Sequence, residues 1–144
     1  MTSIRGFKAI FTIMGVIYIM MASSMLVRGA IVLGEFGIPE KLALDPLVQD
    51  FFSFFYLLMA FTGVLTVLFG HVTRERRHQM LVAAVFCVWN LISAWRDLST
   101  SDSRFGNHLY EGEKTIVFVY IGLAYAAVFG SLVVRGLIGA RRRS

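Results

Sequence analysis

The feature that most constrains this chain is a series of four long apolar runs separated by polar segments. The runs cover residues 9–27, 51–70, 80–95 and 115–134. A helix needs about 20 residues to cross the hydrocarbon of a bilayer, with a range of about 17–25. Three runs have that length, and the third reaches it by including flanking residues. Strands are a poor alternative, because the edges of an open sheet find no partners in lipid.

This pattern predicts an all-α fold, an integral membrane four-helix bundle that forms a single domain over residues 1–144. We expect spans at about 9–30, 47–70, 79–96 and 114–135. The composition agrees, because 57% of the residues are hydrophobic and only 16% are charged, which is more apolar surface than a domain of this size can bury from water. The first run is longer than a typical signal-peptide core and has no clean A-x-A site after it, so we expect it to be retained.

The distribution of charge predicts the orientation of the spans. The N-terminus, the turn at residues 71–79 and the C-terminus together hold nine of the 14 Lys and Arg residues and one acid, Glu75. The two long connections on the other side hold five basic residues and eight acids. Because positive segments stay in the cytoplasm, both termini are expected there, in a cell inner (plasma) membrane. The basic tail needs no nucleic-acid partner to explain it.

Small and polar side chains recur at helical spacing within three runs, and such stripes favour helix–helix contact in lipid. The stripe of the fourth run could face another helix of the same chain or a second copy of it, and the former is the simpler interpretation. The stripes are Ser53, Tyr56, Ala60, Gly63 and Gly70; Ala83, Cys87, Asn90, Ala94 and Asp97; and Gly122, Ala126 and Gly130.

The connection over residues 28–50 is unusually apolar for a loop. Asp45 before Pro46 is typical of a helix start, with Asp45 as the N-cap of the second span. We expect the first helix to continue past Arg28 to about Leu33, and the segment between to lie over the outer end of the bundle.

Ionisable groups gather at the outer ends of the expected spans. A structural interpretation has Arg28, Arg96 and Arg104 neutralising nearby acids, whereas a functional one places a ligand among these groups. Asn90 is the only amide within the four runs. It is expected to make either an interhelical hydrogen bond or a contact with a ligand.

The functional interpretation is a site for a lipophilic small molecule at the outer end, with proton-transfer chemistry of an isomerase or cyclase type. The alternative is a noncatalytic accessory subunit of a larger membrane complex, redox or quinone-linked. Expected partners are membrane lipid and the lipophilic molecule, with a homo-oligomer or larger complex left open; no cofactor or metal is predicted. The candidate acids and bases are Asp50, Asp97, Glu111 and Glu113, and the candidate substrate-binding residues are Arg28, Trp89, Asn90, Arg96, Tyr56 and Tyr120.

The layout of four spans, the run GVLTVLFG at residues 63–70 and the short basic turn after it resemble the small four-helix DoxX-like membrane families. This resemblance implies an accessory role in quinone-linked or redox systems. A second stretch, SDSRF at 101–105 with Glu111 or Glu113 after it, is similar to the G-D-S-R-Y stretch of emopamil-binding, sterol-isomerase-like proteins. Ser101 and Phe105 replace the Gly and Tyr of that stretch, and no catalytic role is transferred.

Overall fold

The computed structural model describes residues 3–35, 38–101 and 112–141, with only the backbone at 100–101, 112–115 and 141. Throughout these ranges the regular structure is helical, without a strand. The elements are α1 (Phe7–Arg28), α2 (Ala30–Glu35), α3 (Glu40–Ala43), α4 (Pro46–Val72), α5 (Arg76–Ser101) and α6 (Gly112–Arg141).

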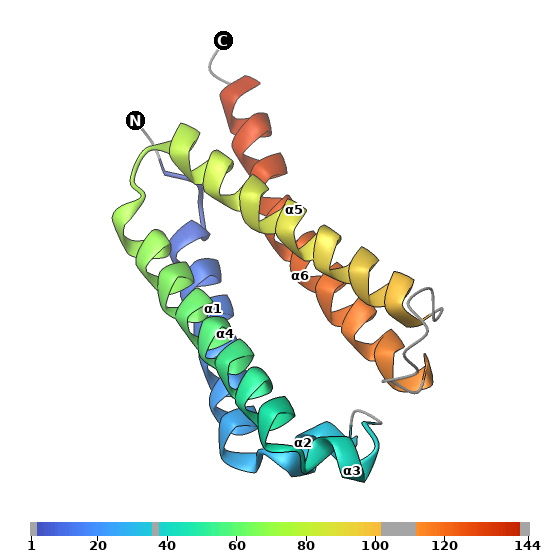
Figure 1. Ribbon diagram of the computed structural model, residues 1–144. Helices are drawn as coiled ribbons and strands as arrows, with labels where there is room; N and C mark the ends of the chain where they lie inside the picture. The colour runs from blue at the N-terminus through green and yellow to red at the C-terminus, as the bar shows by residue number, and fades with distance from the viewer. Residues whose placement is uncertain (1–2, 36–37, 102–111, 142–144) are drawn as a thin grey trace.

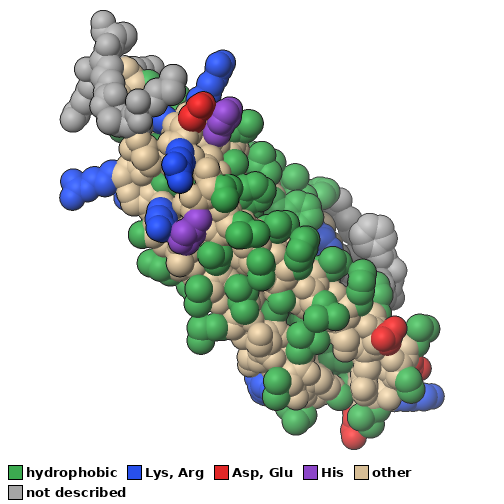
Figure 2. Space-filling view, turned by 90° about the vertical axis from the view of Figure 1, so that its left-hand side faces the viewer, with side chains coloured by type: hydrophobic (Ala, Val, Ile, Leu, Met, Phe, Trp, Pro, Cys, Tyr) green, Lys and Arg blue, Asp and Glu red, His purple; other side chains and the backbone are tan. Residues whose placement is uncertain are grey.

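Four helices in the described part of the chain are long and apolar enough to cross a membrane. The candidate spans are Phe7–Arg28, Pro46–Val72, Arg76–Ser99 and Ile116–Ala140. This confirms the predicted all-α fold with four helices long and apolar enough to span a membrane, and the third reaches that length by taking in the flanks of its apolar run. Figure 2 shows hydrophobic side chains over the middle of one face and Lys, Arg and His gathered toward one end. Such a broad apolar surface fits lipid surroundings.

The four long helices form two antiparallel pairs, α1 with α4 and α5 with α6 (Figure 1). Both chain ends and the α4–α5 turn lie at one end of the molecule, which we call the termini end. The opposite end, where α2 and α3 lie, is called the loop end. The two pairs approach each other toward the termini end and diverge toward the loop end (Figure 1).

Glycines allow α1 and α4 to cross at backbone contact. A Cβ atom added to Gly63 would lie 2.7 Å from the backbone oxygen of Gly15, and one added to Gly15 would lie 2.6 Å from that of Gly63. Two turns farther along α4, a Cβ on Gly70 would lie 2.8 Å from Cβ of Phe11. In lipid, where no hydrophobic force acts between helices, close van der Waals packing of this kind holds a helix pair together.

The second pair packs through the small-residue stripe of α6. A Cβ on Gly122 would lie 3.0 Å from Cβ of Ala94 and 3.2 Å from the backbone oxygen of Asn90 on α5. The stripe of α6 therefore faces another helix of the same chain, as the simpler interpretation predicted.

In the α4 stripe Tyr56, Gly63 and Gly70 are buried, but Ser53 is exposed, so the prediction was wrong for Ser53.

A cluster of aromatic rings joins the two pairs near the termini end. Phe11 of α1 lies 5.1 Å from Phe129 of α6 and 5.4 Å from Phe86 of α5, measured between ring centroids, and both contacts are edge-to-face. Phe7 stacks on Phe11 at 4.3 Å. Phe7, Phe11 and Phe129 are fully buried, together with Leu132. These rings belong to the buried core that joins the pairs, together with Ile4, Met14, Ala83 and Leu132.

Two polar side chains of α5 tie the chain together at the termini end. The Gln79 side chain is buried and accepts from the backbone N–H of Ile4 at 2.7 Å, while its amide donates to the Ser3 hydroxyl and to the Thr73 carbonyl. Arg76 donates to the Gly136 carbonyl of α6 at 2.5 Å. The first residues and the end of α6 are therefore both fastened to the start of α5.

The loop end differs from the prediction at the end of the first helix. Helix α1 stops at Arg28, because Gly29 adopts φ 50° and ψ −125°, a conformation that other residues rarely adopt. The expected continuation to Leu33 is thus wrong, and α2 begins as a separate helix. Figure 1 shows α2 and α3 across the loop end of the α1–α4 pair.

The connection between α2 and α4 packs on the start of α4. Leu33, Ile38 and Ala43 are buried against Val48 and Phe52. The predicted N-cap is confirmed, since the Asp45 carboxylate accepts from the N–H groups of Leu47 and Val48 at 2.9 and 3.3 Å.

Candidate functional site

A small polar cluster lies between the helix pairs, on the loop-end side of the aromatic rings. The Tyr18 hydroxyl of α1 donates to Oδ1 of Asn90 on α5 at 3.0 Å. The Asn90 amide donates to the Phe86 carbonyl one turn earlier at 2.8 Å. The Tyr18 ring meets Tyr125 of α6 edge-to-face at 5.1 Å, and the Tyr125 hydroxyl lies 3.5 Å from the sulfur of Met21. We call these residues the Tyr18–Asn90 cluster.

Asn90 is therefore an interhelical hydrogen-bonding residue, one of the two roles expected for it. Its side chain is 5% exposed, and such a deeply placed amide stabilises a bundle only when it has partners. The sequence interpretation missed Tyr18, Tyr125 and the buried Gln79. The sequence indicated that some tyrosine inside a span could pair with Asn90, the only amide within the runs, but Tyr56, Tyr120 and Tyr125 met the same condition, so Tyr18 could not be singled out.

The face of α1 that points toward the second pair becomes more exposed toward the loop end. Phe7 and Phe11 are 0% exposed and Met14 is 6% exposed. Tyr18, Met21 and Met25, on the same face at helical spacing, are each partly exposed. Arg28 follows as an exposed side chain. The interface between the pairs is thus closed at the termini end and open at the loop end.

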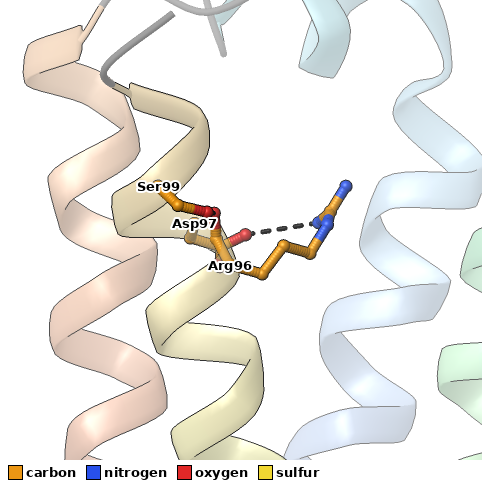
Figure 3. Close-up of polar contacts among 3 residues, drawn as sticks. All are labelled: Arg96, Asp97 and Ser99. Atoms are coloured by element: carbon orange, nitrogen blue, oxygen red, sulfur yellow. Dashed lines mark hydrogen bonds and ion pairs between the residues drawn. The ribbon is translucent and has the colours of Figure 1, made fainter. Parts of the chain in front are cut away.

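Charged side chains sit beside the open part of this interface. Arg28 pairs with Glu35 of α2, and Arg96 of α5 lies 3.3 Å from the Asp97 carboxylate. Figure 3 shows the Arg96 side chain reaching away from α6 toward α1, with the Ser99 hydroxyl donating to the Arg96 carbonyl at 2.8 Å. The Asp97 side chain is 24% exposed and that of Arg96 is 66% exposed. Asp50, at the start of α4, is exposed.

The structure does not gather the predicted aromatic contacts around Asn90. Trp89 is 59% exposed and Tyr120 is 65% exposed, so both lie on outer surfaces, whereas Asn90 faces the interior. Trp89 and Asn90 are separated because adjacent helical residues point about 100° apart. Tyr56 is buried on α4, where its ring contacts Phe52 and Phe55.

Two candidate acids lie outside the described side chains. These are Glu111 and Glu113, together with most of the SDSRF stretch. Among the described candidates, the structure brings together Arg96 and Asp97 and places Arg28 at the same end of the molecule.

The hydrogen bond of the Tyr18–Asn90 cluster predicts a measurable coupling. In a double-mutant cycle with Tyr18→Phe and Asn90→Ala, we expect a coupling free energy of about 0.6–1.7 kcal/mol, the range found for interhelical hydrogen bonds in lipid. The free energy of unfolding in mixed detergent micelles measures it. Tyr120→Phe, which removes an exposed hydroxyl of α6, is the control and should leave stability unchanged. Additive effects of the two substitutions would show that the bond contributes nothing.

Comparison of the chain with known proteins found no match. No family model, no curated protein and no solved structure matches it. The resemblances to DoxX-like and sterol-isomerase-like proteins therefore stay predictions.

Proposed function

We propose that this multi-pass membrane protein binds a lipophilic molecule between its two helix pairs at the loop end. The proposal includes a plasma-membrane location with both termini cytoplasmic, which the excess of Lys and Arg at the termini end supports. The apolar body of the ligand would lie against Met21 and Met25, beyond the Tyr18–Asn90 cluster. Its polar head would meet the arginines of the loop end.

The observation that carries this proposal is the change in burial along one face of α1. Between residues 7 and 14 the face is sealed by the aromatic cluster, and from Tyr18 outward it is partly exposed. An apolar surface opened in this way in a membrane is filled by an apolar molecule, because neither water nor an empty gap is favourable there. Arg96 reaches toward α1 at this level (Figure 3), where its guanidinium can hold a polar head.

Asp97 is the described acid best placed for proton transfer to such a ligand. Its carboxylate is partly shielded and stands beside the Arg96 guanidinium, whereas Asp50 is exposed at the start of α4. A carboxyl group within hydrogen-bond reach of a ligand is one of the groups that can transfer a proton in general acid–base catalysis.

The test is to identify what the protein carries from the membrane. Wild type and Arg96→Gln are purified in mild detergent, and apolar compounds are extracted and measured by mass spectrometry. We expect one compound enriched over bulk lipid in the wild type and about tenfold less of it in Arg96→Gln, the loss of one charge-assisted hydrogen bond. Arg74→Gln, an exposed arginine after α4, is the matched control and should carry the wild-type amount.

Two results would contradict the proposal. One is a wild type that carries no compound above the composition of bulk membrane lipid. The other is an equal decrease in the amount of bound compound in Arg96→Gln and in Arg74→Gln. Recovery of a stoichiometric foreign membrane polypeptide in place of a small molecule would instead support the accessory-subunit interpretation.

A further inference from the structure

A second feature lies at the opposite end of the molecule, where the start of α1 meets the end of α4. An open hollow of about 570 Å³ is present there, and its lining includes Ser3, Lys8, Ala9, Thr12, Ile13 and His71. This volume falls within the range of about 300–1,000 Å³ that is usual for small-molecule sites. Its walls are mostly apolar, with a few polar groups among them.

Two polar side chains of the hollow can donate to an anion. Lys8 supplies an ammonium group and Thr12 supplies a hydroxyl, whereas the Ser3 hydroxyl is already paired with the Gln79 side chain. The Nδ1 atom of His71 donates to the Val67 carbonyl at 2.9 Å, so Nε2 of the neutral ring is an acceptor and offers no hydrogen bond to an anion. The N-cap of α1 is Gly6, which has no side chain to accept from the first-turn amides, and a helix N-terminus favours an anion.

The surroundings of the hollow add positive charge. A Cβ on Gly6, one of the lining residues, would lie 3.6 Å from Nη1 of Arg135, so that guanidinium lies beside α1 at this end. Glu75 is the one acid in the segments at this end, and it pairs with His78 at 3.4 Å. Figure 2 shows Lys, Arg and His side chains gathered toward one end of the space-filling surface. The hollow is thus a partly apolar site in a positive field.

We propose that this hollow binds one anionic glycerophospholipid of the adjoining leaflet. The phosphate lies between Lys8 and the first turn of α1, near the Thr12 hydroxyl, and the upper part of an acyl chain lies against Ala9 and Ile13. The hollow belongs to the membrane boundary because α1 begins its apolar span at Phe7 and α4 ends at Val72. The occupant is a lipid and not a free phosphate, because exposed apolar side chains such as Ile13, which is 58% exposed, form part of the wall.

Native mass spectrometry of the full chain in mild detergent tests this, with added palmitoyl-oleoyl phosphatidylglycerol and, for comparison, phosphatidylcholine with the same acyl chains. We expect phosphatidylglycerol to be retained preferentially. Lys8→Gln should weaken its binding about fivefold, since one basic residue near the surface contributes roughly that factor. Ala9→Trp fills the hollow and should lower binding at least about tenfold. A millimolar excess of inorganic phosphate should not displace the lipid.

Matched variants distinguish a built site from a diffuse positive surface. Arg77→Gln removes the same charge from an exposed position outside the hollow, and Ala127→Trp adds the same ring to an exposed position on α6. Both should bind phosphatidylglycerol like the wild type. Three results would each overturn the proposal. Lys8→Gln and Arg77→Gln could weaken phosphatidylglycerol binding equally, a folded Ala9→Trp could bind the lipid as well as the wild type does, or inorganic phosphate could displace the lipid. This site is at the opposite end from the proposed ligand site, so failure of one proposal would not contradict the other.

Discussion

Replacing Phe11 by alanine is expected to lower the free energy of unfolding by about 3 kcal/mol. The ring is 0% exposed and contacts Phe7, Phe86 and Phe129, so its removal leaves a cavity where the two helix pairs meet. In lipid the ring is not withdrawn from water on folding. The loss therefore reflects missing dispersion contacts, and we expect the lower end of the range for buried aromatic truncations.

Unfolding by a denaturing detergent in mixed micelles measures this effect. The control is Phe54→Ala on α4, which removes the same ring from a position that is 61% exposed and should cost less than about 1 kcal/mol. If the two variants unfold alike, the aromatic cluster does not hold the pairs together.

A methyl group on Gly63 is expected to lower stability by about 2 kcal/mol, the second largest effect. In Gly63→Ala the new Cβ would lie 2.7 Å from the Gly15 carbonyl oxygen and 2.8 Å from Ile19. Because the first of these atoms is backbone, helix α1 has to move away from α4. The gain in helix propensity, about 0.5–1 kcal/mol, offsets only part of this cost.

Gly130→Ala is the matched control for this substitution, since it places the same methyl group in a span at ordinary contact distance, 3.5 Å from Sγ of Cys87. We expect it to be neutral or slightly stabilising. The same unfolding assay compares the two, and equal stability of Gly63→Ala and Gly130→Ala would contradict the close crossing of α1 and α4.

The features that follow local rules could be predicted from the sequence. Span length and apolar content identified the four helices, and the cap at Asp45 followed from its place before Pro46. The α6 stripe was identified because Gly122 and Ala126 repeat at helical spacing. In each case the residues that determine the feature lie within a single segment of the chain.

The features that depend on how helices meet could not be predicted. Gly15 stands alone in its run, and its importance comes from Gly63 on another helix. The partner of Asn90 depends on how α1 and α5 are rotated about their axes, and the rotation of α5 also places Trp89 on an outer surface. The ends of the spans predict how deep in the membrane the charged groups lie. The distances between these groups within the membrane plane depend on how far the two helix pairs diverge.

The central claim is that the interface between the helix pairs is closed at the termini end and open at the loop end. Spin labels on single cysteines at positions 14 and 25, in a Cys87→Ser background in lipid nanodiscs, test it through collisions with dissolved oxygen. A label at position 13, where Ile13 is 58% exposed, gives the lipid-facing reference on the same helix. The predicted result is low accessibility at Met14 and accessibility near the reference at Met25; equally low accessibility at both would contradict the claim.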